Sequence, residues 1–186
     1  MSKSLFMKKW VIAVMALILI GSLVPVYITD ASQARGVPSA NIIRNAYSDK
    51  VLGIGGDDKK SNGAHVVQWN DEDVNDQKWY IRSTGDGYKY IINVESGDYL
   101  DVSEASLLPG DKVIQWPYNG GWNQQWKIVA ADEDGSYYII NRGSGLYLDT
   151  AYSSLSNGAQ IVQQDFSDDY SQRWFIKLVY LSPGSI

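Results

Sequence analysis

The chain of 186 residues contains no cysteine, one histidine and three phenylalanines. Without cysteine no disulfide can staple the fold, so hydrophobic packing must hold it together. A zinc site is excluded on the same count, because only His65 could serve as an imidazole ligand. A Ser/His/Asp triad would also depend on His65, and no nucleophile motif accompanies it. We therefore expect no cofactor, no metal ion and no enzymatic activity.

Basic residues are outnumbered: 16 Lys and Arg stand against 21 Asp and Glu, a formal net charge of −5 at pH 7. Nucleic acids and anionic membrane surfaces are bound through clustered Lys and Arg. This balance excludes nucleic acid as the expected partner. The acidic run at 71–76 lacks the glycine and the spaced ligands of a calcium loop and is interpreted as a solvated loop.

The N-terminus has the pattern of a secretory signal peptide. Three lysines precede an uncharged run at 10–28, and small residues follow near Ala34. We predict a signal peptide at 1–34 and an extracellular, bacterial protein, since an exported chain without cysteine fits a bacterial source best. The alternative is an uncleaved membrane anchor, because the apolar run approaches the ~20 residues that span a bilayer.

What the chain has in abundance is internal repetition. A Gln-x-Trp motif ends at Trp79, Trp126 and Trp174, at spacings of 47 and 48 residues. An Asn, a Ser, a Leu and a Gly recur with nearly the same spacings, at Asn45, Asn93 and Asn141, Ser48, Ser96 and Ser144, Leu52, Leu100 and Leu148, and Gly63, Gly110 and Gly158. Three copies of one unit are therefore predicted, and such copies bury their apolar faces against one another.

Each unit carries the signals of short strands. Segments 88–92 and 136–140 are rich in aromatic and β-branched residues and follow Asp-Gly turns. The segments that begin at the three Gln-x-Trp tryptophans are predicted to be the strands before those turns. Propellers normally need at least four blades, so three units predict a closed β structure of another kind.

Gln-x-Trp at the end of each of three such units resembles the ricin-type β-trefoil lectin family. The resemblance covers 41–180, with a linker at 35–40 and a tail at 181–186. It implies an all-β, twelve-stranded β-trefoil with up to one shallow sugar pocket per unit. It also implies that the three tryptophans of Gln-x-Trp form the structural core of the repeats.

The resemblance assigns sugar contacts most completely in the middle unit. Asp101 would accept sugar hydroxyls, Trp116 would stack on the sugar ring, and Asn123 with Gln124 would form an amide pair. Tyr118 could add a second aromatic edge. Structural alternatives are that Asp101 only caps a turn and that Trp116 only fills space.

The first unit departs from this pattern. It retains Trp69 and Gln77, but Gly53 stands where the Asp belongs and Asp76 stands where the Asn belongs. We expect the loss of the carboxylate to disable this pocket.

The third unit departs at the aromatic position. It retains Asp149 and Gln172, but Gln164 replaces the platform and Ser171 replaces the Asn. Phe166 could substitute for the platform from two residues downstream. The expected order of the three sites is middle, third, first.

The family pattern is shifted in a further respect. Glutamines stand directly before the platform position, at Gln68, Gln115 and Gln163, one residue later than in the ricin B chain. Galactose specificity therefore does not transfer simply.

The function implied is a secreted lectin whose partners are glycans, either of galactose type or polysaccharide. An enzyme or toxin that it serves would be a separate chain, and contact with a membrane would require an uncleaved N-terminal segment. Two alternatives remain open: a protein-binding β-trefoil, either an inhibitor or an accessory toxin subunit, and a glycoside hydrolase.

Overall fold

A computed structural model describes residues 38–132 and 134–182; the predicted signal peptide lies outside the described residues. The described part contains twelve strands. They are β1 (Ser39–Asn45), β2 (Val51–Ile54), β3 (Val66–Trp69), β4 (Trp79–Ser83), β5 (Lys89–Asn93), β6 (Tyr99–Val102), β7 (Val113–Trp116), β8 (Trp126–Ala130), β9 (Tyr137–Asn141), β10 (Tyr147–Thr150), β11 (Ile161–Gln164) and β12 (Trp174–Tyr180). Short 3-10 turns are η2 (Asn75–Gln77), η3 (Ser103–Ala105), η4 (Trp122–Gln124), η5 (Ala151–Ser153) and η6 (Tyr170–Gln172).

Six strands close into a barrel. Antiparallel pairing runs from β12 to β1, β4, β5, β8 and β9, and β9 returns to β12. Closure leaves these six strands without a free edge, which is how small β proteins avoid edge-to-edge association. The strands expected after each Gln-x-Trp motif and each Asp-Gly turn are present as β4, β5, β8, β9 and β12, so the predicted β-trefoil is confirmed.

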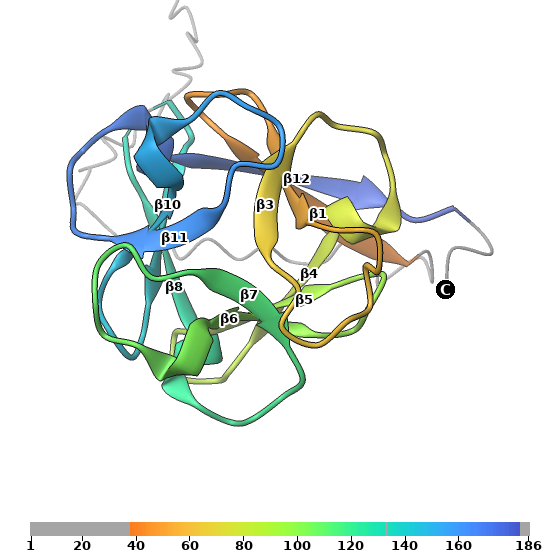
Figure 1. Cartoon of the computed structure of the whole chain (residues 1–186), viewed down its shortest axis with the longest axis horizontal. Coiled ribbons are helices and arrows are strands. Elements are labelled where there is room, and N and C mark those ends of the chain that lie inside the picture. The colour runs from red at the N-terminus through yellow and green to blue at the C-terminus, as the bar shows by residue number, and fades with distance from the viewer. Residues whose placement is uncertain (1–37, 133, 183–186) are drawn as a thin grey trace, which may run out of the picture.

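The other six strands form three hairpins, β2–β3, β6–β7 and β10–β11, over one end of the barrel. Figure 1 looks onto this end and shows β3, β7 and β11 grouped around the centre of a three-lobed molecule. Single bridges join these inner strands, including one between His65 and Ile114. The first strand begins at Ser39, inside the segment predicted as a linker.

The core is built from the repeated positions. Trp79, Trp126 and Trp174 are fully buried, and they pack in one cluster with the repeated leucines and with Ile and Val of all three units. Each indole Nε1 donates to the backbone carbonyl of the repeated leucine of its own unit, at 2.9, 2.9 and 3.0 Å. Burial of a tryptophan therefore leaves no polar group unpaired, which a buried indole requires.

The shifted glutamines hold the repeats together. Gln115 is fully buried; its Oε1 accepts from the Ser96 hydroxyl, and its Nε2 donates to the carbonyls of Lys59 and Ser61 in the first repeat. Gln68 and Gln163 make the corresponding contacts to Ser48 and Ser144 and to the loop of another repeat. The shift thus has a structural reason: these amides join neighbouring units and do not face a sugar.

Candidate functional site

The middle repeat contains a groove of about 650 Å³ beside the β6–β7 hairpin. Asp101, Trp116 and Asn123 all line it, although they come from β6, the end of β7 and η4. The groove is open to solvent and combines one aromatic face with a few polar groups. This composition suits a sugar, which has an apolar C–H face and hydroxyl edges.

Asp101 lies at the centre of an amide cluster. Its Oδ2 atom accepts from Nδ2 of Asn123 and Nε2 of Gln124, both at 2.9 Å, and from Nδ2 of Asn119 at 3.2 Å. All three donors reach the same oxygen, so Oδ1 receives none of them. The cluster fixes the orientation of the carboxylate before any ligand arrives.

Burial dominates the electrostatics of this carboxylate. Only 2% of Asp101 is exposed. Desolvation raises its pKa, and the hydrogen bonds from Gln124, Asn123 and Asn119 partly oppose this. The carboxyl group of Asp101 therefore protonates more readily than that of an exposed Asp.

Gln124 lies behind the groove and holds Asp101 by a hydrogen bond. It is fully buried, its Oε1 accepts from the backbone N–H of Asn119, and its Nε2 also donates to the carbonyl of Pro117. Gln77 and Gln172 brace the loops of their own repeats in the same way. Gln124 therefore positions Asp101 and does not line the surface.

Trp116 is the exposed aromatic wall. Its exposed fraction is 41%, and its ring rests against the backbone of Gly63 from the first repeat, where an added Cβ would lie 3.3 Å from the ring. Gly63 has a φ of +80°, a left-handed conformation that favours glycine. The platform therefore depends on two repeats.

Tyr118 lies outside the groove. Its ring packs against Tyr90 and Tyr99, with centroids 5.7 and 5.2 Å away. Phe166 makes the same contacts with Tyr138 and Tyr147 in the third repeat, at 5.5 and 5.1 Å. Both residues belong to aromatic clusters in their repeats, and neither lines the middle groove.

Sequence reasoning missed several groove residues. Asn119, Ser103, Glu104, Lys112 and His65 all line the groove. Asn119 follows Trp116 by three residues in a polar Gly-containing loop, and an amide at that position was the available signal. Ser103 and Glu104 come from η3, Lys112 directly precedes β7, and His65 comes from the first repeat, so only the folded topology brings them here.

The third repeat holds its carboxylate differently. Asp149 Oδ2 accepts from Nε2 of Gln172 at 3.0 Å, while Oδ1 is buried without a hydrogen-bond partner among the described residues. Burial raises the pKa of Asp149, and the side chains of Gln172 and Ser171 oppose this rise. Gln164 occupies the end of β11, so no aromatic ring stands where Trp116 stands in the middle repeat.

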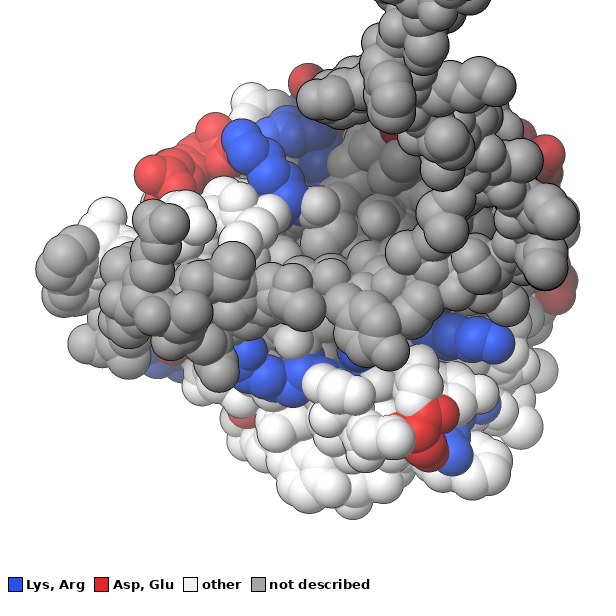
Figure 2. Space-filling model, turned by 180° about the vertical axis from the view of Figure 1, so that it is seen from behind, with Lys and Arg blue, Asp and Glu red and all other residues white. Residues whose placement is uncertain are grey.

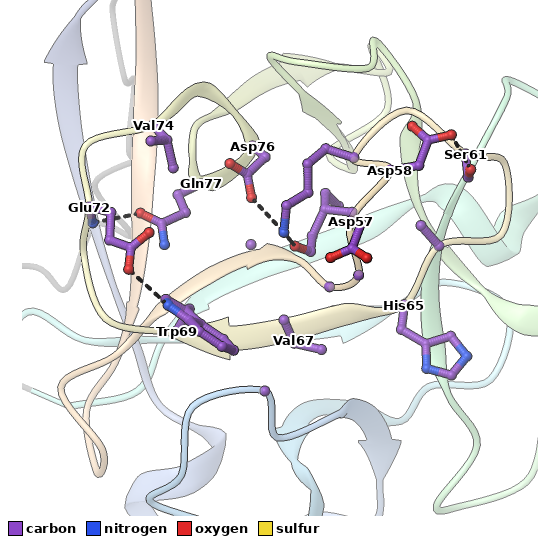
Figure 3. Close-up of a pocket in the computed structure, with 17 residues that line it drawn as sticks. Asp57, Asp58, Ser61, His65, Val67, Trp69, Glu72, Val74, Asp76 and Gln77 are labelled. Atoms are coloured by element: carbon purple, nitrogen blue, oxygen red, sulfur yellow. Dashed lines mark hydrogen bonds and ion pairs between the residues drawn. The ribbon is translucent and has the colours of Figure 1, made fainter.

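The first repeat has a cavity of about 1060 Å³, and Figure 3 shows its lining. Trp69 and Asp76 line it together with Gly53. His65 borders both this cavity and the middle groove, so the two lie on either side of one residue.

Within residues 38–132 and 134–182, no group of three or more His, Asp or Glu side chains could hold a metal ion. No helix of that same part is long and apolar enough to cross a membrane. On the face opposite the hairpins, the Lys and Arg side chains in view lie among uncharged residues, some beside acidic ones (Figure 2).

Comparison with known proteins decides the family. The model of the ricin-type beta-trefoil lectin domain-like family matches residues 35–116 and 122–182. The chain belongs to this family. Membership supports carbohydrate binding. No match was found among curated proteins.

Solved structures agree on the fold. A designed three-fold symmetric protein, ThreeFoil, is 36% identical, with a TM-score of 0.71 over 74% of this chain and 96% of that one. An exo-beta-1,3-galactanase from Clostridium thermocellum is 37% identical, with a TM-score of 0.72 over 76% of this chain; the chain spans only 30% of that enzyme. A Macrolepiota procera ricin B-like lectin in complex with lactose is 19% identical over 75% of this chain and 94% of that one, with a TM-score of 0.63, and shows the fold alone.

Proposed function

We propose that this protein is a non-enzymatic lectin that binds an uncharged saccharide in the groove of the middle repeat. The observation that carries the proposal is the convergence of Asp101, Trp116 and Asn123 on one open groove. Family membership and the lectins among its structural neighbours support the same class of function.

The mechanism follows from the free oxygen of Asp101. Its Oδ2 is occupied by three amides, so Oδ1 is the atom that would accept one or two sugar hydroxyls. The face of Trp116 would cover the C–H side of the same ring. Because the carboxylate and its amides are already ordered, binding would cost little side-chain entropy.

The charges at the groove favour an uncharged ligand. Two carboxylates, on Asp101 and Glu104, and one ammonium, on Lys112, line the groove. A sialylated or uronic-acid sugar would bring its carboxylate toward that excess of negative charge. We infer a galactose-type sugar or a neutral polysaccharide, and the galactanase and the lactose-bound lectin noted above make β-linked galactosides the first to try.

Glycan-array binding tests this function. The purified protein is compared with Asp101→Ala and Trp116→Ala, each checked for an unchanged circular-dichroism spectrum and melting temperature. We expect the native protein to bind and both variants to lose binding. Failure of the native protein to bind any glycan would refute the lectin function and favour a protein-binding β-trefoil.

The absence of catalysis has its own test. A chromogenic β-galactoside incubated with the protein should show no turnover above the buffer rate. Turnover that Asp101→Asn abolishes would instead establish a glycoside hydrolase. The galactanase noted above is much longer than this chain, so its activity is not carried over.

We also propose that the protein is exported, with residues 1–34 removed. The support is the lysine-flanked apolar run alone. Mass spectrometry of the protein from a culture medium should find an N-terminus near Arg35. A cell-bound protein that starts at Met1 would indicate the uncleaved anchor.

A further inference from the structure

Three loops of the described part each contain an asparagine followed directly by a glycine, at Asn62-Gly63, Asn119-Gly120 and Asn157-Gly158. In such a pair the backbone nitrogen of the glycine can attack the side-chain carbonyl carbon of the asparagine, because glycine has no Cβ to block the approach. The attack expels ammonia and leads to an aspartate. In a folded protein it requires that the glycine nitrogen be free.

In two of the pairs the fold engages this nitrogen. The backbone N–H of Gly63 donates to the carbonyl of Gln115 at 2.8 Å, and that of Gly158 donates to the carbonyl of Gln68 at 2.9 Å. Both glutamines are fully buried and belong to a different repeat from the glycine that they bind. Attack by either nitrogen would first break a hydrogen bond between repeats, so we expect the fold to protect both pairs.

The pair Asn119-Gly120 is different. The backbone N–H of Gly120 donates no hydrogen bond to any residue of 38–132 or 134–182. Both residues are exposed, in the loop between β7 and η4. The attacking nitrogen is therefore free in this pair, unlike in the other two.

The side chain of Asn119 is also held in a suitable orientation. Its Oδ1 accepts from the backbone N–H of Gly121 at 2.7 Å, and its Nδ2 donates to Oδ2 of Asp101 at 3.2 Å. The first bond folds the amide back over the peptide of Gly120. The same bond would stabilise the negative charge that develops on Oδ1 as the nitrogen attacks.

We propose that Asn119 deamidates spontaneously in the folded protein, ahead of Asn62 and Asn157, and that the reaction inactivates the middle groove. A bond forms between the Gly120 nitrogen and Cγ of Asn119, the bond from Cγ to Nδ2 breaks, and the amine leaves as ammonia with the proton of the Gly120 nitrogen. Water then opens the cyclic imide at either carbonyl, which gives aspartate or its β-linked isomer. The deamidation is independent of the proposed lectin function, whereas the effect on binding rests on it.

Either product would disturb the groove. Aspartate would place a second carboxylate where an amide now donates to Asp101, and the two like charges would repel each other. The β-linked isomer would in addition lengthen the main chain at residue 119, whose backbone N–H donates to Gln124 at 2.9 Å. The carboxylate that would accept the sugar hydroxyls therefore loses part of its support.

Peptide mapping tests the deamidation without reference to saccharides. The purified protein is aged in mildly alkaline buffer and then cleaved after Lys and Arg, which places the three pairs in separate peptides, 61–78, 113–127 and 143–173. Fragmentation in the mass spectrometer locates each deamidated residue. We expect Asn119 to react about tenfold faster than Asn62 or Asn157, because their glycine nitrogens must first lose a hydrogen bond.

The unfolded reference is the same set of peptides, cleaved first and aged afterwards. There the three pairs should react at similar rates, because no fold protects any of them. An intact Asn119 in the aged folded protein, or a rate at Asn62 or Asn157 that equals its rate, would overturn the proposed deamidation.

The effect on the groove is tested with Asn119→Asp and the matched control Asn62→Asp, which brings the same change of charge at an exposed residue. The strongest ligand from the glycan array, with lactose as the first probe, should bind Asn119→Asp about tenfold more weakly and Asn62→Asp as tightly as the native protein. The deamidated protein, separated from fresh protein by anion exchange, should show the same loss.

Unchanged affinity of Asn119→Asp would overturn the inactivation and leave the deamidation standing. An equal loss in Asn62→Asp would show that added charge alone is responsible, and would overturn it as well. If the fresh protein bound no glycan, the lectin function would fail and the inactivation with it, and the peptide map would still decide the deamidation.

Discussion

The middle and third repeats both keep an aspartate on the second strand of the unit, but the hydrogen-bond donors and the ring around it differ. Three amides hold Oδ2 of Asp101, and an exposed tryptophan stands across the groove. Asp149 has one amide donor, an unpaired buried oxygen and no ring at the platform position. Retention of the carboxylate is therefore not enough to make a site; the amides that orient it and the ring opposite it must be present as well.

One glycine accounts for part of this difference. A Cβ on Gly121 would lie 2.2 Å from Oδ1 of Asn123, so the amide can reach Asp101 only because residue 121 has no side chain. The third repeat has Asp169 at that position and Ser171, a shorter side chain, in place of Asn123. The first repeat has Val74 there and Asp76, whose Oδ2 lies 3.8 Å from the position of a Cβ on Gly53. The missing side chain at residue 121 is therefore one condition for the contact between Asn123 and Asp101 in the middle repeat.

The largest expected effect is the difference in saccharide affinity between Asp101→Ala and Asp149→Ala. Asp101→Ala removes a charged acceptor worth about 1.5–3 kcal/mol per hydrogen bond, so we expect about a 10- to 100-fold loss of saccharide affinity by calorimetric titration. Asp149→Ala should change affinity less than about twofold, because its repeat lacks the platform. Equal losses in the two variants would show that the third repeat is an equal site.

The next effect comes from Gly121→Ala. The backbone there is extended, with a φ of −72°, so alanine brings no strain of its own. The methyl group must displace Asn123, which breaks its bond to Asp101, and we expect about a tenfold loss of affinity. Unchanged affinity at an unchanged melting temperature would mean that Asn123 is dispensable.

A smaller loss of saccharide affinity is expected from substitution of Gly63, which lies against the ring of Trp116. Gly63→Ala and Gly110→Ala place alanine at φ angles of +80° and +85°, and each costs about 1 kcal/mol of stability. Only at Gly63 does the new methyl group press on Trp116; nothing lies within 4 Å at Gly110. We expect about a threefold loss of affinity for Gly63→Ala alone, and equal affinities would contradict the role of Gly63 as the support of the ring.

The smallest effect concerns stability. Burial raises the pKa of Asp149 above its unfolded value, so the folded protein binds the proton more readily and loses stability as pH rises through that pKa. Asp149→Asn removes this cost, and thermal melts at pH 7 should show a gain of a few degrees at most, on the order of 1 kcal/mol. The gain should vanish below about pH 4, the range of an unfolded Asp.

Asp101→Asn is the matched comparison for this stability effect. Its carboxylate is also buried, but three amide donors already compensate the charge. An asparagine would turn part of those contacts into donor–donor or weaker contacts, so we expect no stabilisation at pH 7. A gain equal to that of Asp149→Asn would show that the amide cluster does not compensate the buried charge.

The repeat spacing predicted three copies of one β unit in a closed structure, and the resemblance to the ricin-type family supplied the trefoil topology. Trp79, Trp126 and Trp174 recur with Leu52, Leu100 and Leu148, and in the structure each indole bonds the carbonyl of its leucine. A pairing that depends on residues 26 or 27 positions apart leaves a periodic trace in the sequence. Strand identity followed from the same trace, because each unit repeats its own hairpins.

The details of the pockets were harder to predict. The direction of Tyr118 depends on the loop after β7, and its ring contacts Tyr90 and Tyr99, which are distant in the sequence. The position of Asp76 depends on the missing Cβ of Gly53 and on Gln77. Side-chain direction beyond a strand end is set by tertiary packing, and a residue-by-residue comparison of repeats cannot show it.

The most direct test of the central claim is a crystal structure with the array-selected saccharide bound. We predict a sugar ring against Trp116 with a hydroxyl within hydrogen-bond distance of Oδ1 of Asp101, while Oδ2 keeps its three amide donors. A saccharide bound elsewhere on the protein, with the middle groove empty at saturating ligand, would contradict the account.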